Sequence, residues 1–344
     1  MIEVKNLTKK YGDHTAVKNL SFTVESGTIY GFLGPNGAGK STTMNILTGC
    51  LSATEGEVLI NGHDIFEDAI EAKKCIGYLP EQPPLYLDMT PLEYLSFVAK
   101  AKGLSKAERE DQIVEVMQVT GIEKVAHRLM KHLSKGYRQR VGIAQALLGN
   151  PEIIILDEPT VGLDPMQIIE IRELITKLGK NHTVILSSHI LSEVSAVCSH
   201  IMIISKGELV ASDTPKNLEA MFQGTSTLRL TIKGTEAQAK EIADSIDAID
   251  STLCRPGEDG QTYVQYKSHA DRDFREEVFF AYAQRQIPIL AMSIKHVSLE
   301  DVFLQVTQED KTAKEVPVQE ENHAEETKTQ AEPEESTAVG GEEA

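Results

Sequence analysis

The sequence has no run of apolar residues long enough to cross a membrane. A spanning helix needs about 18 or more consecutive apolar residues, and no window of the 344 residues approaches that length. Residues 1–6 also lack the features of a signal peptide. The sequence therefore predicts a cytoplasmic chain that does not itself span a membrane.

Cysteine and basic residues are both scarce. The four cysteines, Cys50, Cys75, Cys198 and Cys254, are scattered without any Cys-x-x-Cys pair. Reduced thiols are therefore expected, rather than a disulfide or metal framework. Lys and Arg number 34 against 52 Asp and Glu, which gives a net charge of −18. A nucleic-acid partner would call for a basic stripe, so this balance argues against one.

Residues 34–41 form a complete G-x-x-x-x-G-K-[ST] motif directly after the apolar run Ile29–Leu33. The glycines let the main chain wrap around anionic oxygens, Lys40 supplies a mobile positive charge to the β- and γ-phosphates, and Ser41 offers a hydroxyl to Mg²⁺. A dinucleotide fingerprint is excluded, because it needs G-x-G-x-x-G and has no use for the lysine. The motif predicts a nucleoside triphosphate site. Its residues are Gly34, Pro35, Asn36, Gly37, Ala38, Gly39, Lys40, Ser41 and Thr42.

A second anion site is indicated by Leu133–Tyr137, which precedes an amphipathic helical pattern over 138–148. Ser134 and Gly136 would lie at the N-terminus of that helix, where backbone N–H groups favour an anion. Such a site cannot reach the phosphate loop of its own chain if the two sit on separate lobes. We therefore expect it to serve a neighbouring molecule.

Two carboxylates end the β-branched apolar run Ile153–Leu156. Asp157 would hold Mg²⁺, directly or through water, and Glu158 would orient or deprotonate the attacking water. Adjacent residues of a strand point to opposite faces, but the end of a strand allows both carboxylates to approach one nucleotide.

With these motifs in this order and spacing, residues 1 to about 222 resemble the ATP-binding cassette family, specifically the nucleotide-binding subunit of a bacterial export-type ABC transporter. The resemblance rests on the three segments above together with Val161–Asp164 and Ser187–His189. It implies a P-loop NTPase fold of the α/β class, with a RecA-like core, an antiparallel β layer and a helical lobe. It also implies ATP and Mg²⁺ as cofactors, and ATP hydrolysis that powers export.

The resemblance implies partners and further residue roles. His189 would contact the γ-phosphate and Glu158, Asp164 would couple the two sites of a dimer, and Tyr11 would stack on adenine, with packing in a β-sheet as its alternative. Two cassettes would close around two Mg-ATP molecules, so one chain needs a second cassette subunit, expected to be a second copy. A separate membrane permease would carry the cargo, with this chain peripheral on the cytoplasmic face of the membrane.

Two departures from the family pattern stand out. The usual signature is Leu-Ser-Gly-Gly-Gln, and Lys135 and Tyr137 replace its first glycine and its glutamine. Because Ser134 and Gly136 are kept, we expect that site to work. The metal-sensing glutamine of the family falls on Glu81 rather than Gln82 when the segment is aligned at Leu85–Tyr86. Glu81 is therefore assigned to the metal, and Gln82 stays open as the alternative.

The remaining chain is long enough for a second domain. We predict the cassette over 1–222 and a small α+β domain over 223–308, for which a ferredoxin-like fold is one candidate. Its strands are expected at Thr227–Ile232, Thr262–Tyr266 and Ile287–Ile294, and its helices at Glu236–Ile246 and Arg272–Ala283. Residues 309–344 hold twelve acidic and three basic side chains. Such a composition predicts a disordered acidic tail.

The sequence leaves two other functions open. A cassette ATPase acting in translation or DNA repair usually has two cassettes or long coiled-coil insertions, and neither is found here. A catalytically weak regulatory subunit would fit the altered signature but not the intact Glu158 and His189.

Overall fold

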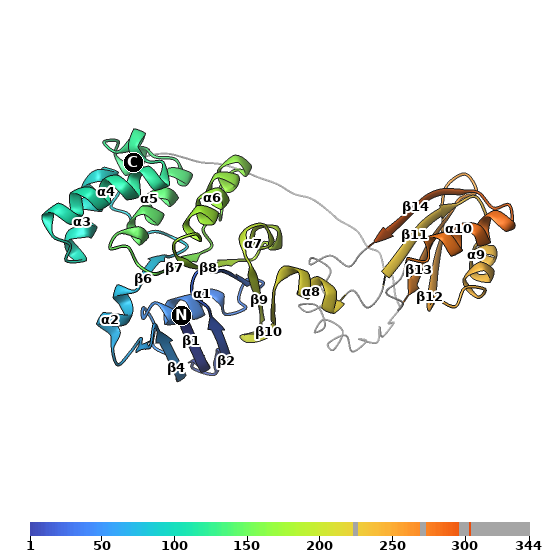
Figure 1. The fold of residues 1–344 in the computed structure, drawn as a ribbon, viewed down its shortest axis with the longest axis horizontal. Coiled ribbons are helices and arrows are strands. Elements are labelled where there is room, and N and C mark those ends of the chain that lie inside the picture. The colour runs from blue at the N-terminus through green and yellow to red at the C-terminus, as the bar shows by residue number, and fades with distance from the viewer. Residues whose placement is uncertain (223–225, 269–272, 296–302, 304–344) are drawn as a thin grey trace, which may run out of the picture. The chain divides into compact units, whose positions relative to one another are not determined.

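The computed structural model describes residues 1–222, 226–268, 273–295 and Phe303 (Figure 1). Within these residues the chain forms three sheets. No helix of this described part is long and apolar enough to cross a membrane.

A six-stranded sheet forms the centre of the cassette, in the order β10-β9-β3-β8-β7-β6. Its strands run parallel except for β10, which pairs antiparallel with β9. Parallel strands covered on both faces are apolar throughout, and every residue of β7 and β8 is buried. The strands are β3 (Ile29–Leu33), β6 (Ile76–Leu79), β7 (Ile153–Asp157), β8 (Thr183–Ser188), β9 (His200–Ser205) and β10 (Glu208–Asp213).

Successive residues of the central strands enter two different cores. Ile154 and Leu156 of β7 join the apolar cluster that contains residues of α5, α6 and α7. Ile153 and Ile155 join the cluster built from α1 and a second, antiparallel sheet. This alternation follows from the period of two in a strand. The helices are α1 (Lys40–Leu47), α2 (Ala69–Lys74), α5 (Lys135–Leu147), α6 (Pro165–Leu178), α7 (Leu191–Val197) and α8 (Pro215–Phe222).

The antiparallel layer has the order β2-β1-β4-β5. Its long strands are β1 (Ile2–Tyr11) and β2 (His14–Val24), which pair across a short turn. The layer also contains β4 (Glu55–Ile60) and β5 (His63–Asp64). The predicted antiparallel layer beside an α/β core is thus confirmed.

The helical lobe contains α3 (Pro91–Ala101), α4 (Lys106–Thr120) and α5, with short 3₁₀ turns at η1 (Glu123–Val125) and η2 (Met130–His132). Thr90 caps α3. Its hydroxyl accepts from the backbone N–H of Glu93, whose carboxylate accepts from the N–H of Thr90. The lobe therefore starts with a helix whose first N–H groups are satisfied locally.

A third sheet lies in the C-terminal part of the chain, in the order β12-β13-β11-β14, and all its pairs are antiparallel. With two helices between its strands, this is the βαββαβ arrangement of a ferredoxin-like fold. The sheet and helices have an apolar core of their own, with Tyr266 and Tyr282 joined through their hydroxyls at 2.5 Å. The elements are β11 (Ser226–Ile232), α9 (Glu236–Ala243), β12 (Ser251–Pro256), β13 (Thr262–Ser268), α10 (Arg275–Gln284) and β14 (Ile289–Lys295).

One strand of this sheet, β12, is not among those predicted from the sequence. β12 is an edge strand in which no residue is fully buried, so its sequence carries little of the apolar pattern that marks a strand. The domain boundaries at 222 and 308 stay predictions. The predicted acidic tail, residues 309–344, lies outside the described residues.

Candidate active site

The phosphate loop connects the end of β3 to the first residue of α1, Lys40. At two positions of this loop only glycine fits, because the backbone of another segment lies too close for a side chain. A Cβ on Gly34 would lie 2.4 Å from the carbonyl oxygen of Ile204, and a Cβ on Gly39 would lie 2.6 Å from that of Ala16. Because Gly39 is the N-cap of α1 and has no side chain to bond the first-turn N–H groups, these groups are left for an anion.

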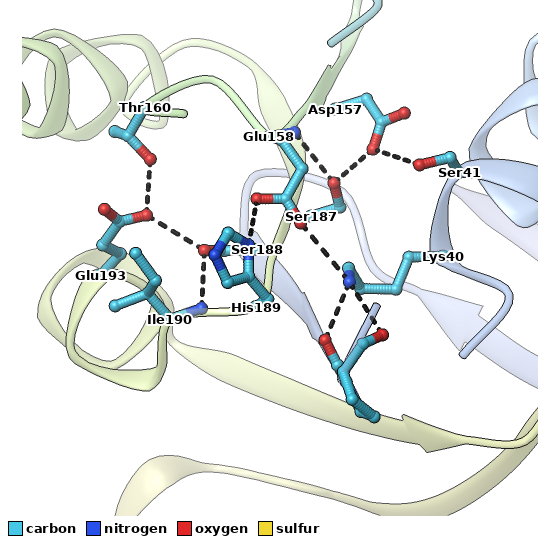
Figure 2. Close-up of polar contacts among 12 residues, drawn as sticks. Lys40, Ser41, Asp157, Glu158, Thr160, Ser187, Ser188, His189, Ile190 and Glu193 are labelled. Carbon is cyan, nitrogen blue, oxygen red and sulfur yellow. Dashed lines mark hydrogen bonds and ion pairs between the residues drawn. The ribbon is translucent and has the colours of Figure 1, made fainter. Parts of the chain in front are cut away.

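Lys40 lies folded back over this loop and is only 5% exposed. Its Nζ donates to the carbonyl oxygens of Gly34 at 2.8 Å and Pro35 at 3.3 Å. The same Nζ lies 3.4 Å from Oε1 of Glu158 (Figure 2). The structure thus holds one positive charge between the phosphate loop and the end of β7.

Asp157 lies beside the hydroxyl that follows Lys40. Its Oδ1 accepts from Oγ of Ser41 at 3.3 Å and from Oγ of Ser187 at 2.5 Å (Figure 2). Burial raises the pKa of Asp157 above its ordinary value, although the hydrogen bonds from Ser187 and Ser41 oppose that shift. A cation next to this buried carboxylate would favour its charged form.

Glu158 follows the last residue of β7 and adopts a left-handed backbone conformation, with φ 48°. For a residue with a side chain this costs roughly 1–3 kcal/mol and needs support from its surroundings. Here the backbone N–H of Glu158 donates to Oγ of Ser187 at 2.9 Å. The turn explains how two adjacent carboxylates can both approach one site.

His189 follows β8, and its Nδ1 lies 2.9 Å from Oε2 of Glu158 (Figure 2). The carboxylate of Glu158 therefore lies between an imidazole and the ammonium of Lys40. The ends of β3, β7 and β8, which are neighbours in the sheet, bring these three side chains together.

The cleft in front of these residues has a volume of about 480 Å³. Ten residues predicted from the sequence line it, and Glu81 is among them whereas Gln82 is not. Tyr11 also lines the cleft, and 49% of this residue is exposed. The lining residues are Tyr11, His14, Ala16, Asn36, Gly37, Gly39, Lys40, Ser41, Thr42, Glu81, Glu158, Val161 and His189.

Seven predicted residues are not among those that line this cleft. Four of them, Gly34, Pro35, Ala38 and Asp157, lie in or beside the phosphate loop, and the other three are Ser134, Gly136 and Asp164. Ser134 is the N-cap of α5, and Asp164 is the N-cap of α6. Gly136 packs against the start of α6, since a Cβ on it would meet Oε1 of Gln167 at 2.4 Å. None of the three lines the cleft described above. Their predicted role toward the nucleotide of a neighbouring molecule stays a prediction.

Several residues at the site had no predicted role. His14, Ala16 and Val161 line the cleft, and Ser187 bonds both Asp157 and the N–H of Glu158. Ser187 belongs to a motif already quoted for the family resemblance. Its hydroxyl, next to a strand end, was the signal that could have revealed it.

Comparison with known proteins identifies the family. The sequence model of the ABC transporter family matches residues 17–161. The bacitracin transport ATP-binding protein BcrA of Bacillus licheniformis is 35% identical over 308 residues, which cover 89% of this chain and 97% of that protein. The chain belongs to the ABC transporter ATP-binding proteins. Another relative, the linearmycin resistance ATP-binding protein LnrL of Bacillus subtilis, is 32% identical over 313 residues, covering 89% and 98%.

Solved ABC cassettes share the fold. One, a dimeric ATP-binding cassette in a post-hydrolysis state bound to ADP and Pi, matches with a TM-score of 0.57 and 31% identity over 62% of this chain and 98% of that one. The ABC cassette fold predicted from the sequence is therefore confirmed. As a member of this family, the chain binds ATP and hydrolyses it to power transport.

Proposed function

We propose that this chain drives export, working as a pair of copies bound to a separate permease at the cytoplasmic face of the membrane. The observation that carries the proposal is the placement of Lys40, Glu158 and His189 around one cleft at the ends of three neighbouring strands. The intact contact between Glu158 and His189 speaks against a catalytically weak regulatory subunit. The relatives include a bacitracin transport protein and a linearmycin resistance protein. Their names favour export of an antibiotic-like cargo.

The residues present fit a magnesium ion. Ser41 and Asp157 offer oxygen ligands side by side, and Glu81 offers another at the cleft. In the part of the chain that the structure describes, no cluster of three or more His, Cys, Asp or Glu could hold a metal. A magnesium site completed by water and by the phosphates of ATP needs only one or two carboxylates. Bound there, Mg²⁺ would neutralise charge on the phosphates.

Each residue at the site would then have a separate role in hydrolysis. Lys40 and the phosphate loop bind the phosphates, and Tyr11 stacks on the base. Glu158 takes a proton from the attacking water, and His189 holds the Glu158 carboxylate in place while it contacts the γ-phosphate. Ser134, Gly136 and Asp164 would act on the nucleotide held by the second copy, because they lie away from the cleft of their own chain.

Reconstitution with a membrane subunit tests this function. We expect the chain to hydrolyse ATP faster in liposomes that contain its permease subunit than in liposomes without one. Co-expression of the two should also raise the bacitracin or linearmycin tolerance of a sensitive host. A permease that leaves both ATP hydrolysis and tolerance unchanged would argue against an export subunit.

The two side chains at 81 and 82 are distinguished by a magnesium titration. Because Glu81 lines the cleft and Gln82 does not, Glu81→Ala should raise the Mg²⁺ concentration for half-maximal ATPase activity by about tenfold. Gln82→Ala is the matched control and should change it little. The opposite result would assign the metal-sensing role to Gln82, and two silent variants would remove it from both.

A further inference from the structure

Glu193 is a buried carboxylate of α7 that the proposed chemistry does not use. Only 4% of it is exposed, and it does not line the cleft. Its Oε2 accepts from Oγ1 of Thr160 at 2.5 Å and from Oγ of Ser188 at 3.0 Å (Figure 2). In the described part of the chain, no Lys, Arg or His forms an ion pair with it.

These hydrogen bonds connect the two segments that carry the proposed active-site residues. Thr160 lies on the segment after β7, two residues beyond Glu158, and Ser188 directly precedes His189. The hydroxyl of Ser188 also accepts from the backbone N–H of Ile190 at 3.0 Å. Glu193 thus joins the residues that follow Glu158 to the residues on either side of His189.

A second connection lies on the other side of the same two segments. Ser187 donates to Asp157 and accepts from the backbone N–H of Glu158. Glu158 therefore lies between one anchored residue, Asp157, and another, Thr160. Because a buried carboxylate holds its hydroxyl donors with charge-assisted hydrogen bonds, the anchor at Glu193 resists movement more than neutral partners would.

We propose that Glu193 is a positioning residue for ATP hydrolysis, which keeps Nδ1 of His189 and Oε2 of Glu158 at their 2.9 Å contact. This inference rests on the roles proposed above for Glu158 and His189. Glu193 does not reach the nucleotide cleft, so its effect falls on the orientation of the reacting groups and not on the binding of ATP. Misplacement of catalytic groups by about 1 Å can cost about 100-fold in rate.

Steady-state kinetics of the full-length chain test the proposal. Glu193→Met removes the oxygen that accepts both hydrogen bonds, and we expect kcat to fall about 10- to 100-fold while KM for Mg-ATP stays within about twofold. Glu193→Gln keeps one acceptor oxygen and should retain an intermediate kcat. Glu173→Met and Glu173→Gln, at an exposed position of α6, are the matched controls and should leave kcat unchanged.

A double-mutant cycle separates positioning from general stability. Thr160→Val removes one donor to Glu193 and should lower kcat by itself, whereas adding it to Glu193→Met should cause little further loss, since both act through one network. Independent, additive losses would overturn the proposal. So would a lower melting temperature with unchanged kcat, or a raised KM with unchanged kcat.

The test of Glu193 can fail while the catalytic roles proposed for Glu158 and His189 hold, and the variants distinguish these two cases. If Glu158→Gln abolishes hydrolysis but Glu193→Gln and Thr160→Val have the full kcat, the inference about Glu193 alone is wrong. If Glu158→Gln itself hydrolyses ATP normally, the catalytic roles fail first. Should Glu193→Met not fold, the Gln and Val variants still decide the question, because each changes only one polar group.

Discussion

Replacing Glu158 with glutamine should leave ATP binding intact while it lowers steady-state hydrolysis by about 10²- to 10⁴-fold. The amide cannot accept the proton of the attacking water, and general-base catalysis supplies about that factor. The contacts proposed to hold the phosphates come from Lys40 and the phosphate loop, and the substitution changes neither of them. Measurement of kcat together with ATP affinity checks the prediction.

The same variant should also accumulate a dimer with ATP, because the closed state is no longer dispersed by hydrolysis. Size-exclusion chromatography with and without ATP would show it. Glu173→Gln, an exposed position of α6, serves as control and should remain active and show no added dimer. A Glu158→Gln variant that stays monomeric and hydrolyses ATP normally would contradict both the role of this residue and the paired arrangement.

Lys40→Ala should act at an earlier step and weaken ATP binding itself. We expect the affinity to fall about 10- to 100-fold, the value of one or two hydrogen bonds to a charged group. Loss of this ammonium also leaves Oε1 of Glu158 without its nearby cation. Fluorescent-nucleotide titration measures the change, with Lys180→Ala at an exposed position as control. Unchanged affinity would disprove the assignment of the phosphate loop.

Local signals in the sequence predicted much of the fold and the site. The phosphate loop depends on the short spacing of its motif and lies where predicted, directly after β3. The cap at Thr90 depends on a residue three positions later. The start of α6 is marked by the capping residue Asp164 followed by Pro165. Each of these features is determined by neighbours within a few residues, which is why a single sequence can reveal it.

Features set by long-range contacts were harder to predict. Ser187 and Glu193 gained their roles from residues about 30 positions earlier in the chain, Asp157 and Thr160, and no local pattern marks such pairs. Likewise, spacing assigned the metal-sensing position to Glu81 and left Gln82 open. Glu81 lines the cleft and Gln82 does not, and the role of Glu81 stays a prediction. β12 was not predicted because an exposed edge strand has little apolar periodicity.

The position of β3 in the sheet has a consequence for biosynthesis. This early strand pairs with nothing synthesised soon after it, because Ile29 lies opposite Val184 and Tyr30 lies opposite His200. At about 5–20 residues per second on the ribosome, roughly 8–30 seconds separate the strand from its partners. During that interval the apolar residues of β3 have no place in the sheet, and the nascent chain cannot yet form its ATP site. Chaperone binding at this stage would protect the strand from aggregation.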